Sequence, residues 1–114
     1  MMIEKTVLDY LAEELSVPVY MEKPANPPAS YVIVIKTGSG VTNFIFRATI
    51  VIQSIAETLY EAALLNEEVK NAMDQIVTLP EITHSSLNSD YEFTNTQTKE
   101  RRYQAVYDLV HYGG

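Results

Sequence analysis

The stretch Phe44-Ile-Phe-Arg-Ala-Thr-Ile-Val-Ile-Gln53 decides the fold, because its side chains alternate with the period of a β-strand. One face of this strand is wholly apolar and has to be covered by the rest of the chain; it holds Phe44, Phe46, Ala48, Ile50 and Ile52. The opposite face mixes polar and apolar side chains, namely Ile45, Arg47, Thr49, Val51 and Gln53. We therefore expect a central strand with one face on the core and the other face covered in part, or covered by another molecule.

Composition limits the class of protein. The chain has 114 residues, of which 46% are hydrophobic and 20% are charged, so we expect a single domain over residues 1–114. The absence of cysteine excludes disulfides, thiol catalysis and cysteine–zinc sites. No apolar run reaches the roughly 18 residues of a membrane span, and the N-terminus lacks the layout of a signal peptide, so a cytosolic protein without a membrane partner is expected. The net charge of −7 argues against a protein that lives by binding nucleic acid.

Two stretches have the pattern of amphipathic helices. Apolar residues recur at helical spacing over residues 3–15, opposite a charged side. After the central strand the period changes from two to 3.6, which predicts a second helix over residues 58–77. Two capping boxes compete for its start, and we prefer the one that pairs Thr58 with Glu61 over the one that begins at Ser54.

A β-hairpin is predicted over residues 31–53. Residues 31–36 are dense in β-branched side chains, which favour strands, and Thr37-Gly38-Ser39-Gly40 then interrupts the pattern. We therefore expect a flexible tip over residues 37–43, either a plain turn or an interaction loop. A phosphate cradle is excluded because no strand-to-helix transition follows these glycines.

A second long strand is predicted over residues 102–112. Its two faces repeat the design of the central strand, and the apolar one holds Tyr103, Ala105, Tyr107, Leu109 and His111. Residues 84–93 form a weaker strand, and residues 95–100 are polar enough for the loop between the two. The two long strands are therefore expected in the same sheet.

The order of elements gives the fold class. We predict an α+β domain in which two helices pack on one face of a mostly antiparallel sheet. The other sheet face is too apolar for water and too polar for a core; it holds Arg47, Thr49, Val51, Val106, Asp108, Val110 and Tyr112. A contact between subunits would resolve this conflict.

Candidates for catalysis are few. His84 and His111 lack a metal-binding spacing, and Asp90 and Glu92, taken with Lys99, lack the Glu-x-Lys element of metal-dependent nucleases. We therefore predict no catalytic residue, no metal and no cofactor, and a protein that is not an enzyme. A small cytosolic ligand-binding protein or enzyme that uses His84, Asp90 and Glu92 is the alternative from another class, and a pocket joining these three would favour it.

Three groups of phrases, spread over nearly the whole chain, together resemble a known family. They are Pro18-Val-Tyr-Met-Glu22 through Pro27-Pro28 into Tyr31-Val-Ile-Val-Ile-Lys-Thr-Gly38; Ala48-Thr-Ile-Val-Ile-Gln-Ser54 through Tyr60-Glu-Ala-Ala63 with Leu65-Asn-Glu67; and Ser89-Asp-Tyr-Glu-Phe-Thr94 through Arg102-Tyr-Gln-Ala-Val-Tyr-Asp108. With its length and element order, the chain resembles the tail-terminator, or tail-completion and head–tail joining, proteins of tailed bacteriophages and prophages with long non-contractile tails.

The resemblance implies a structural role in a virion. Proteins of this family form rings, commonly hexamers, that sit on the last ring of the tail tube, stop tail polymerisation and present a surface to the head connector. The implied partners are other copies of the chain, the tail-tube protein and the head–tail connector protein. DNA would only pass through the lumen, whose acidic walls repel phosphates. The implied location is the tail or neck of the virion, assembled in the bacterial host cytoplasm; another neck or connector adaptor protein is the alternative within this class.

The candidate partner-binding residues come from the patterns above, since the family brings no fixed contact residues. They lie in the hairpin tip, on the mixed sheet face and before the last strand: Gly38, Ser39, Gly40, Arg47, Thr49, Val51, Lys99, Arg101, Arg102, Val106 and Tyr112. Lys99, Arg101 and Arg102 form a local basic exception in an acidic chain. They could hold an acidic neighbouring ring or form a solvated hairpin end.

Overall fold

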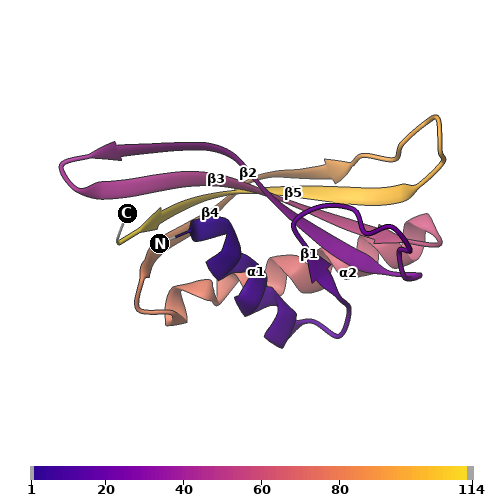
Figure 1. Cartoon of the computed structure of the whole chain (residues 1–114), viewed down its shortest axis with the longest axis horizontal. Coiled ribbons are helices and arrows are strands. Elements are labelled where there is room, and N and C mark those ends of the chain that lie inside the picture. Colours follow the sequence, from indigo (N-terminus) through magenta and orange to yellow (C-terminus); the bar gives the residue numbers. More distant parts are fainter. Residues whose placement is uncertain (1, 113–114) are drawn as a thin grey trace.

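The computed structural model describes residues 2–112 of the chain. In this range two α-helices lie against a five-stranded, mostly antiparallel sheet, which confirms the predicted α+β class (Figure 1). The elements in chain order are α1 (Ile3–Glu14), β1 (Val19–Tyr20), β2 (Tyr31–Thr42), β3 (Ile45–Ala56), α2 (Leu59–Asp74), a 3₁₀ turn (Ile76–Thr78), β4 (Ile82–Glu92) and β5 (Arg101–His111).

The strand order is β1-β2-β3-β5-β4, so the strand that decides the fold lies in the middle of the sheet. β1 is parallel to β2, and the other neighbours are antiparallel. β5 pairs with β3 over its whole length, from Phe46 opposite His111 to Ala56 opposite Arg101. The prediction that the two long strands share one sheet is therefore confirmed.

Both helices cover the same face of the sheet, which we call the helix face (Figure 1). Ile50 and Ile52 of β3 are fully buried there, with Val7 and Leu11 of α1 and, on α2, Val69. Each such side chain contributes about 1.5–3 kcal/mol by leaving water. The alternation of the central strand thus places the core between the sheet and the two helices.

The second helix begins where the preferred capping box predicts. The Thr58 side chain accepts a hydrogen bond from the backbone N–H of Glu61 at 3.1 Å, which satisfies one of the free donors of the first turn. The helix proper ends at Asp74, and a 3₁₀ turn continues it to Thr78. The predicted range of residues 58–77 thus contains two elements.

The hairpin over residues 31–53 is confirmed, but its predicted tip over residues 37–43 is wrong. β2 runs through the glycine-rich segment to Thr42, with a register irregularity between Lys36 and Gly38. The turn consists of Asn43 and Phe44, whose φ angles are 53° and 66°. Backbone pairing with β3 continues past the glycines, because a ladder needs only the backbone groups and not the lost side-chain alternation.

The expectation that Phe44 lies on the covered face is also wrong. Its side chain is 92% exposed, because the residue belongs to the turn and not to β3. Residues 38–47, which we call the arm, extend past the helices at the left end of Figure 1. Val41 and Ile45 on the arm are exposed as well.

The last two strands form a second hairpin that points toward the opposite end of the sheet from the arm (Figure 1). The predicted weak strand is present as β4, and the polar loop over residues 95–100 is present as its tip. The backbone N–H of Asn95 donates to the carbonyl oxygen of Glu100 at 3.1 Å and closes this tip. Two register irregularities interrupt the pairing of β4, which forms an edge of the sheet.

Candidate functional site

The sheet face opposite the helices, the outer face, brings together six of the predicted partner-binding residues. Gly40 lies opposite Arg47, and Gly38 lies opposite Thr49. Val51, two residues beyond Thr49 on β3, lies opposite Val106. Since directly opposite residues of an antiparallel pair share a face, the backbone register alone assembles this group.

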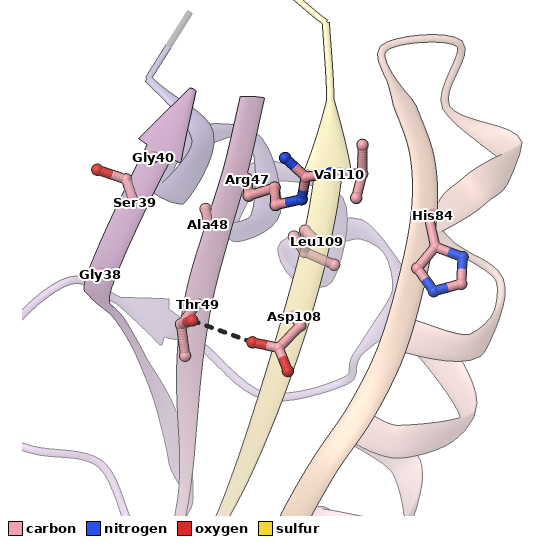
Figure 2. A pocket seen from close by; sticks show the side chains of 10 residues that line it. All are labelled: Gly38, Ser39, Gly40, Arg47, Ala48, Thr49, His84, Asp108, Leu109 and Val110. Atoms are coloured by element: carbon pink, nitrogen blue, oxygen red, sulfur yellow. Dashed lines mark hydrogen bonds between the residues drawn. The ribbon is translucent and has the colours of Figure 1, made fainter. Parts of the chain in front are cut away.

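An open hollow of about 360 Å³ lies on this face at the base of the arm. Figure 2 shows its lining, which comes from β2, β3, β4 and β5: Gly38, Ser39, Gly40, Arg47, Ala48, Thr49, His84, Asp108, Leu109 and Val110. A Cβ added at Gly38 or Gly40 would meet no atom within 4 Å. The hollow therefore exists partly because β2 has no side chains at these two positions.

Polar side chains on the outer face hydrogen-bond one another in two groups. Asp108 accepts from the Thr49 hydroxyl and, with its second oxygen, from the Asn88 amide, both at 3.0 Å. Nearer the other hairpin, the Gln53 amide donates to the Gln104 carbonyl oxygen at 3.0 Å, and the Gln104 amide donates to the Tyr91 hydroxyl at 2.6 Å. Because these groups already have partners, covering the face with protein would leave few of them unsatisfied.

Arg47 differs from the other polar residues of this face. Its side chain is exposed and reaches toward β5 beside the hollow (Figure 2). Over residues 2–112, no carboxylate lies within 4.0 Å of its guanidinium. Arg47 thus offers an open charge at the rim of the hollow.

The end of the outer face farther from the arm is closed by its own side chains. Tyr31, Ile33 and Ile55 are buried there, and the ring of Tyr20 packs edge-on against that of Tyr31 at a centroid distance of 6.1 Å. Val51, next in line, is only 7% exposed. The open part of the face is therefore the part that contains the hollow.

A polar cluster around Glu100 ties this closed end to the tip of the second hairpin. Glu100 accepts from the Tyr31 hydroxyl at 3.0 Å and pairs with Lys23 at 2.9 Å. Burial and the bond to Glu100 raise the pKa of Tyr31 to about 12. Burial alone would raise the pKa of Glu100, but the hydrogen bonds from Lys23 and Tyr31 outweigh it and lower that pKa.

The three basic residues before the last strand lie far along the sheet from the hollow, and they do not act as one free patch. Arg102 stacks its guanidinium 4.7 Å from the ring centre of Phe93 and lies 3.5 Å from Glu100. Lys99 and Arg101 are exposed. Tyr112, at the end of β5, is exposed near the arm but outside the lining of the hollow.

The residues of the enzyme alternative lie on different faces of the sheet. His84 lies opposite Val110 on the outer face and lines the hollow. Asp90 lies on the helix face, where it accepts hydrogen bonds from Asn66 and Lys70 of α2. No group of three potential metal ligands occurs within residues 2–112. The pocket that would favour this alternative is therefore not formed by His84 and Asp90.

Sequence reasoning missed several residues of the hollow, among them His84, Asp108 and Val110 as lining groups. The alternation of residues 102–112 already placed Asp108 and Val110 on the mixed face, but it gave no register against β3. His84 carried no such signal, because two irregularities shift the faces of β4.

Within residues 2–112, no helix is long and apolar enough to cross a membrane.

Comparisons with known proteins show likeness of fold only. No protein-family model and no curated protein matches the chain. A crystal structure from Akkermansia muciniphila is 14% identical with a TM-score of 0.48, and covers 96% of this chain. The match takes in 49% of the Akkermansia chain, so this chain spans about half of its length. A chain of the virion of a native gene transfer agent particle is 16% identical with a TM-score of 0.49, over 90% of this chain and 84% of the other. At these values neither likeness carries an argument about function.

Proposed function

We propose that this chain is a structural subunit of a phage or prophage particle. In this role it forms a ring, as a hexamer, on the end of the tail tube, ends tail polymerisation and joins the tail to the head. The ring is located in the tail or neck of the virion and is assembled in the cytoplasm of the host. The resemblance of the sequence phrases to tail-terminator proteins supports this function, and so does the agreement between the implied α+β fold and the observed one.

The observation that carries the proposal is the outer face of the sheet. Among residues 2–112 no helix covers this face, yet it contains buried Val51, a hollow at the base of the arm and polar groups that are already hydrogen-bonded. Such a face can be covered by a second protein surface with few of its polar groups left unpaired, and the open charge of Arg47 is available to that second surface. Contact between neighbouring copies through this face would generate a ring if the rotation closes.

The proposal assigns no catalysis to the chain. His84 and Asp90 lie on different faces of the sheet, which supports a role in assembly over one in chemistry. The acidic chain also suits a lumen through which DNA passes, because its net charge of −7 repels phosphates. The basic pair Lys99 and Arg101 would contact an acidic neighbouring ring from the opposite end of the sheet.

The test combines mass in solution with tube length. The purified chain is run through size exclusion with light scattering over a concentration series, alone and with purified tail-tube protein, and tube lengths are measured by electron microscopy. We expect a discrete ring mass and shorter tubes. A chain that stays monomeric in both settings and leaves tube length unchanged would refute the proposal.

A matched pair of charge reversals locates the contact. Arg47→Glu places an acid at the rim of the hollow and should reduce ring formation by about tenfold, which corresponds to about 1.4 kcal/mol. Lys5→Glu makes the same change of charge on exposed α1, on the opposite side of the sheet, and should leave the ring intact. Equal effects of the two variants would show that net charge, and not the outer face, governs assembly.

A further inference from the structure

The turn of the arm holds a side chain that the fold does not use. Phe44 has φ of 66°, in the left-handed region that bulky residues rarely adopt, and its ring is 92% exposed. A two-residue turn with positive φ at both positions favours glycine after asparagine. A phenylalanine here therefore strains the backbone and leaves an aromatic ring in water. An observed strain of this kind points to a function for the side chain.

The same chain contains a hollow that suits such a ring. Val110 gives it an apolar side chain, and two glycines leave the β2 side open. Ala48 and Leu109 also line it, although their side chains are buried in the core on the helix face. The Arg47 guanidinium at its rim can lie over an aromatic face, an arrangement in which cation and ring attract each other. Asp108 is the acidic residue in this lining, and its two oxygens already accept hydrogen bonds.

Charge makes the arm the part of the chain that another copy can approach. Residues 23–56 contain three basic residues and no acidic one, whereas the rest of the chain contains five basic and all fifteen acidic residues. Two copies, each with a net charge of −7, repel each other over most of their surface. Within the arm, Arg47 is the one charged residue, so contact through the arm avoids this repulsion.

We propose that Phe44 of one copy inserts into the outer-face hollow of the next copy. The ring and the hollow lie at different places on the chain, so each copy offers one of each, and the contact is head-to-tail. This inference rests on the proposed ring-forming function and specifies its contact.

Two substitutions test the Phe44 side chain and the hollow one at a time. Phe44→Gly removes the ring and places the residue that the turn favours, so the fold should gain stability. Gly40→Val fills the hollow from β2, where the added Cβ has open space and β-branching favours a strand. Melting temperatures at or above that of the unchanged chain would show that both variants fold.

The readout is mass by sedimentation velocity over a concentration series, alone and with tail-tube protein. We expect each variant to be monomeric at concentrations at which the unchanged chain forms its ring. An equimolar mixture should give dimers of unlike chains, because the Gly40→Val copy supplies a Phe44 ring and the Phe44→Gly copy supplies an open hollow. The control is Tyr60→Ala, which removes an exposed aromatic side chain from α2. This variant should form the oligomeric ring normally.

Each contrary result has a distinct meaning. If the variants form the oligomeric ring at the same concentrations as the unchanged chain, the insertion of Phe44 is overturned. The proposed ring-forming function would not be affected by this result. Variants that form the ring but no longer shorten tubes would make the tail-tube protein the occupant of the contact, and would overturn the choice of a second copy. An unchanged chain that is monomeric in both settings would overturn the inference together with the proposed function.

Discussion

Replacing Glu100 with alanine tests how the start of β2, at Tyr31, is held to the residue that precedes β5. The substitution removes the acceptor of the Tyr31 hydroxyl and the partner of Lys23. Tyr31 is only 2% exposed, so its hydroxyl would lose its partner in a buried place, at a cost of about 1–3 kcal/mol. The Lys23 pair adds less, about 0.2–1 kcal/mol, because the lysine side chain is half exposed.

We therefore expect Glu100→Ala to lower the free energy of unfolding by about 2 kcal/mol, and the melting temperature by roughly 8 °C for a domain of this size. Tyr31→Phe removes the hydroxyl along with the need for an acceptor, so it should cost only about 0.5–1 kcal/mol. In the Tyr31→Phe background, Glu100→Ala should then cost about 1 kcal/mol less than it does alone.

Urea unfolding of the four chains of this double-mutant cycle at pH 7 measures these values. The lowered pKa of Glu100 adds a pH signature. Its stabilising effect is fully present above the unfolded value near 4.5 and disappears as the pH falls through the lower folded value. The gap between the unchanged chain and Glu100→Gln should therefore shrink below about pH 4.5. Additive costs in the cycle, with a gap independent of pH, would refute the role assigned to Glu100.

Further predictions concern the core, the tyrosines and the link between α2 and β4. Ile50→Ala removes a fully buried side chain of the middle strand and should cost about 2–5 kcal/mol in urea unfolding; a loss under 1 kcal/mol would contradict this packing. Burial and the charge of Asp74 raise the pKa of Tyr107 to about 12, so Tyr107→Phe should remove one late step from an ultraviolet titration, and a loss near pH 10 would contradict it. Hydrogen bonds to Glu67 and Asp90 raise the pKa of Lys70, and Lys70→Met should cost about 0.5–1 kcal/mol at low salt and less at high salt; a cost independent of salt would count against these pairs.

The sequence predicted those parts of the fold in which side-chain alternation carries the information. Apolar residues at every second position predicted the long strands β3 and β5 and their shared sheet. The capping box at Thr58 predicted the start of α2. The arm was not foreseen, because its glycines have no side chains to alternate while their backbone groups still pair. The turn at Asn43 and Phe44 was missed for a related reason, since a phenylalanine is not the residue that such a turn favours.

The candidate site was predictable only in part. Alternation placed Arg47, Thr49 and Val51 on the mixed face, and pairing in the sheet set Val51 opposite Val106. The bonds that satisfy Asp108 depend on the register of three strands, which no single stretch of sequence specifies. Whether the eleven predicted residues bind partners is a prediction that the assembly experiments will decide.

The opposite directions of the two hairpins have a mechanical consequence. β3 begins at the arm and β5 begins at the other hairpin, and eleven residue pairs join them in between. A pull that separates the two hairpin ends along the 44 Å long axis would slide these strands past each other. All of their interstrand hydrogen bonds would then resist together, whereas a pull across the sheet would break them one after another. A subunit gripped at both ends would therefore be stiff along its length, the direction in which tension would pass from one bound neighbour to the next.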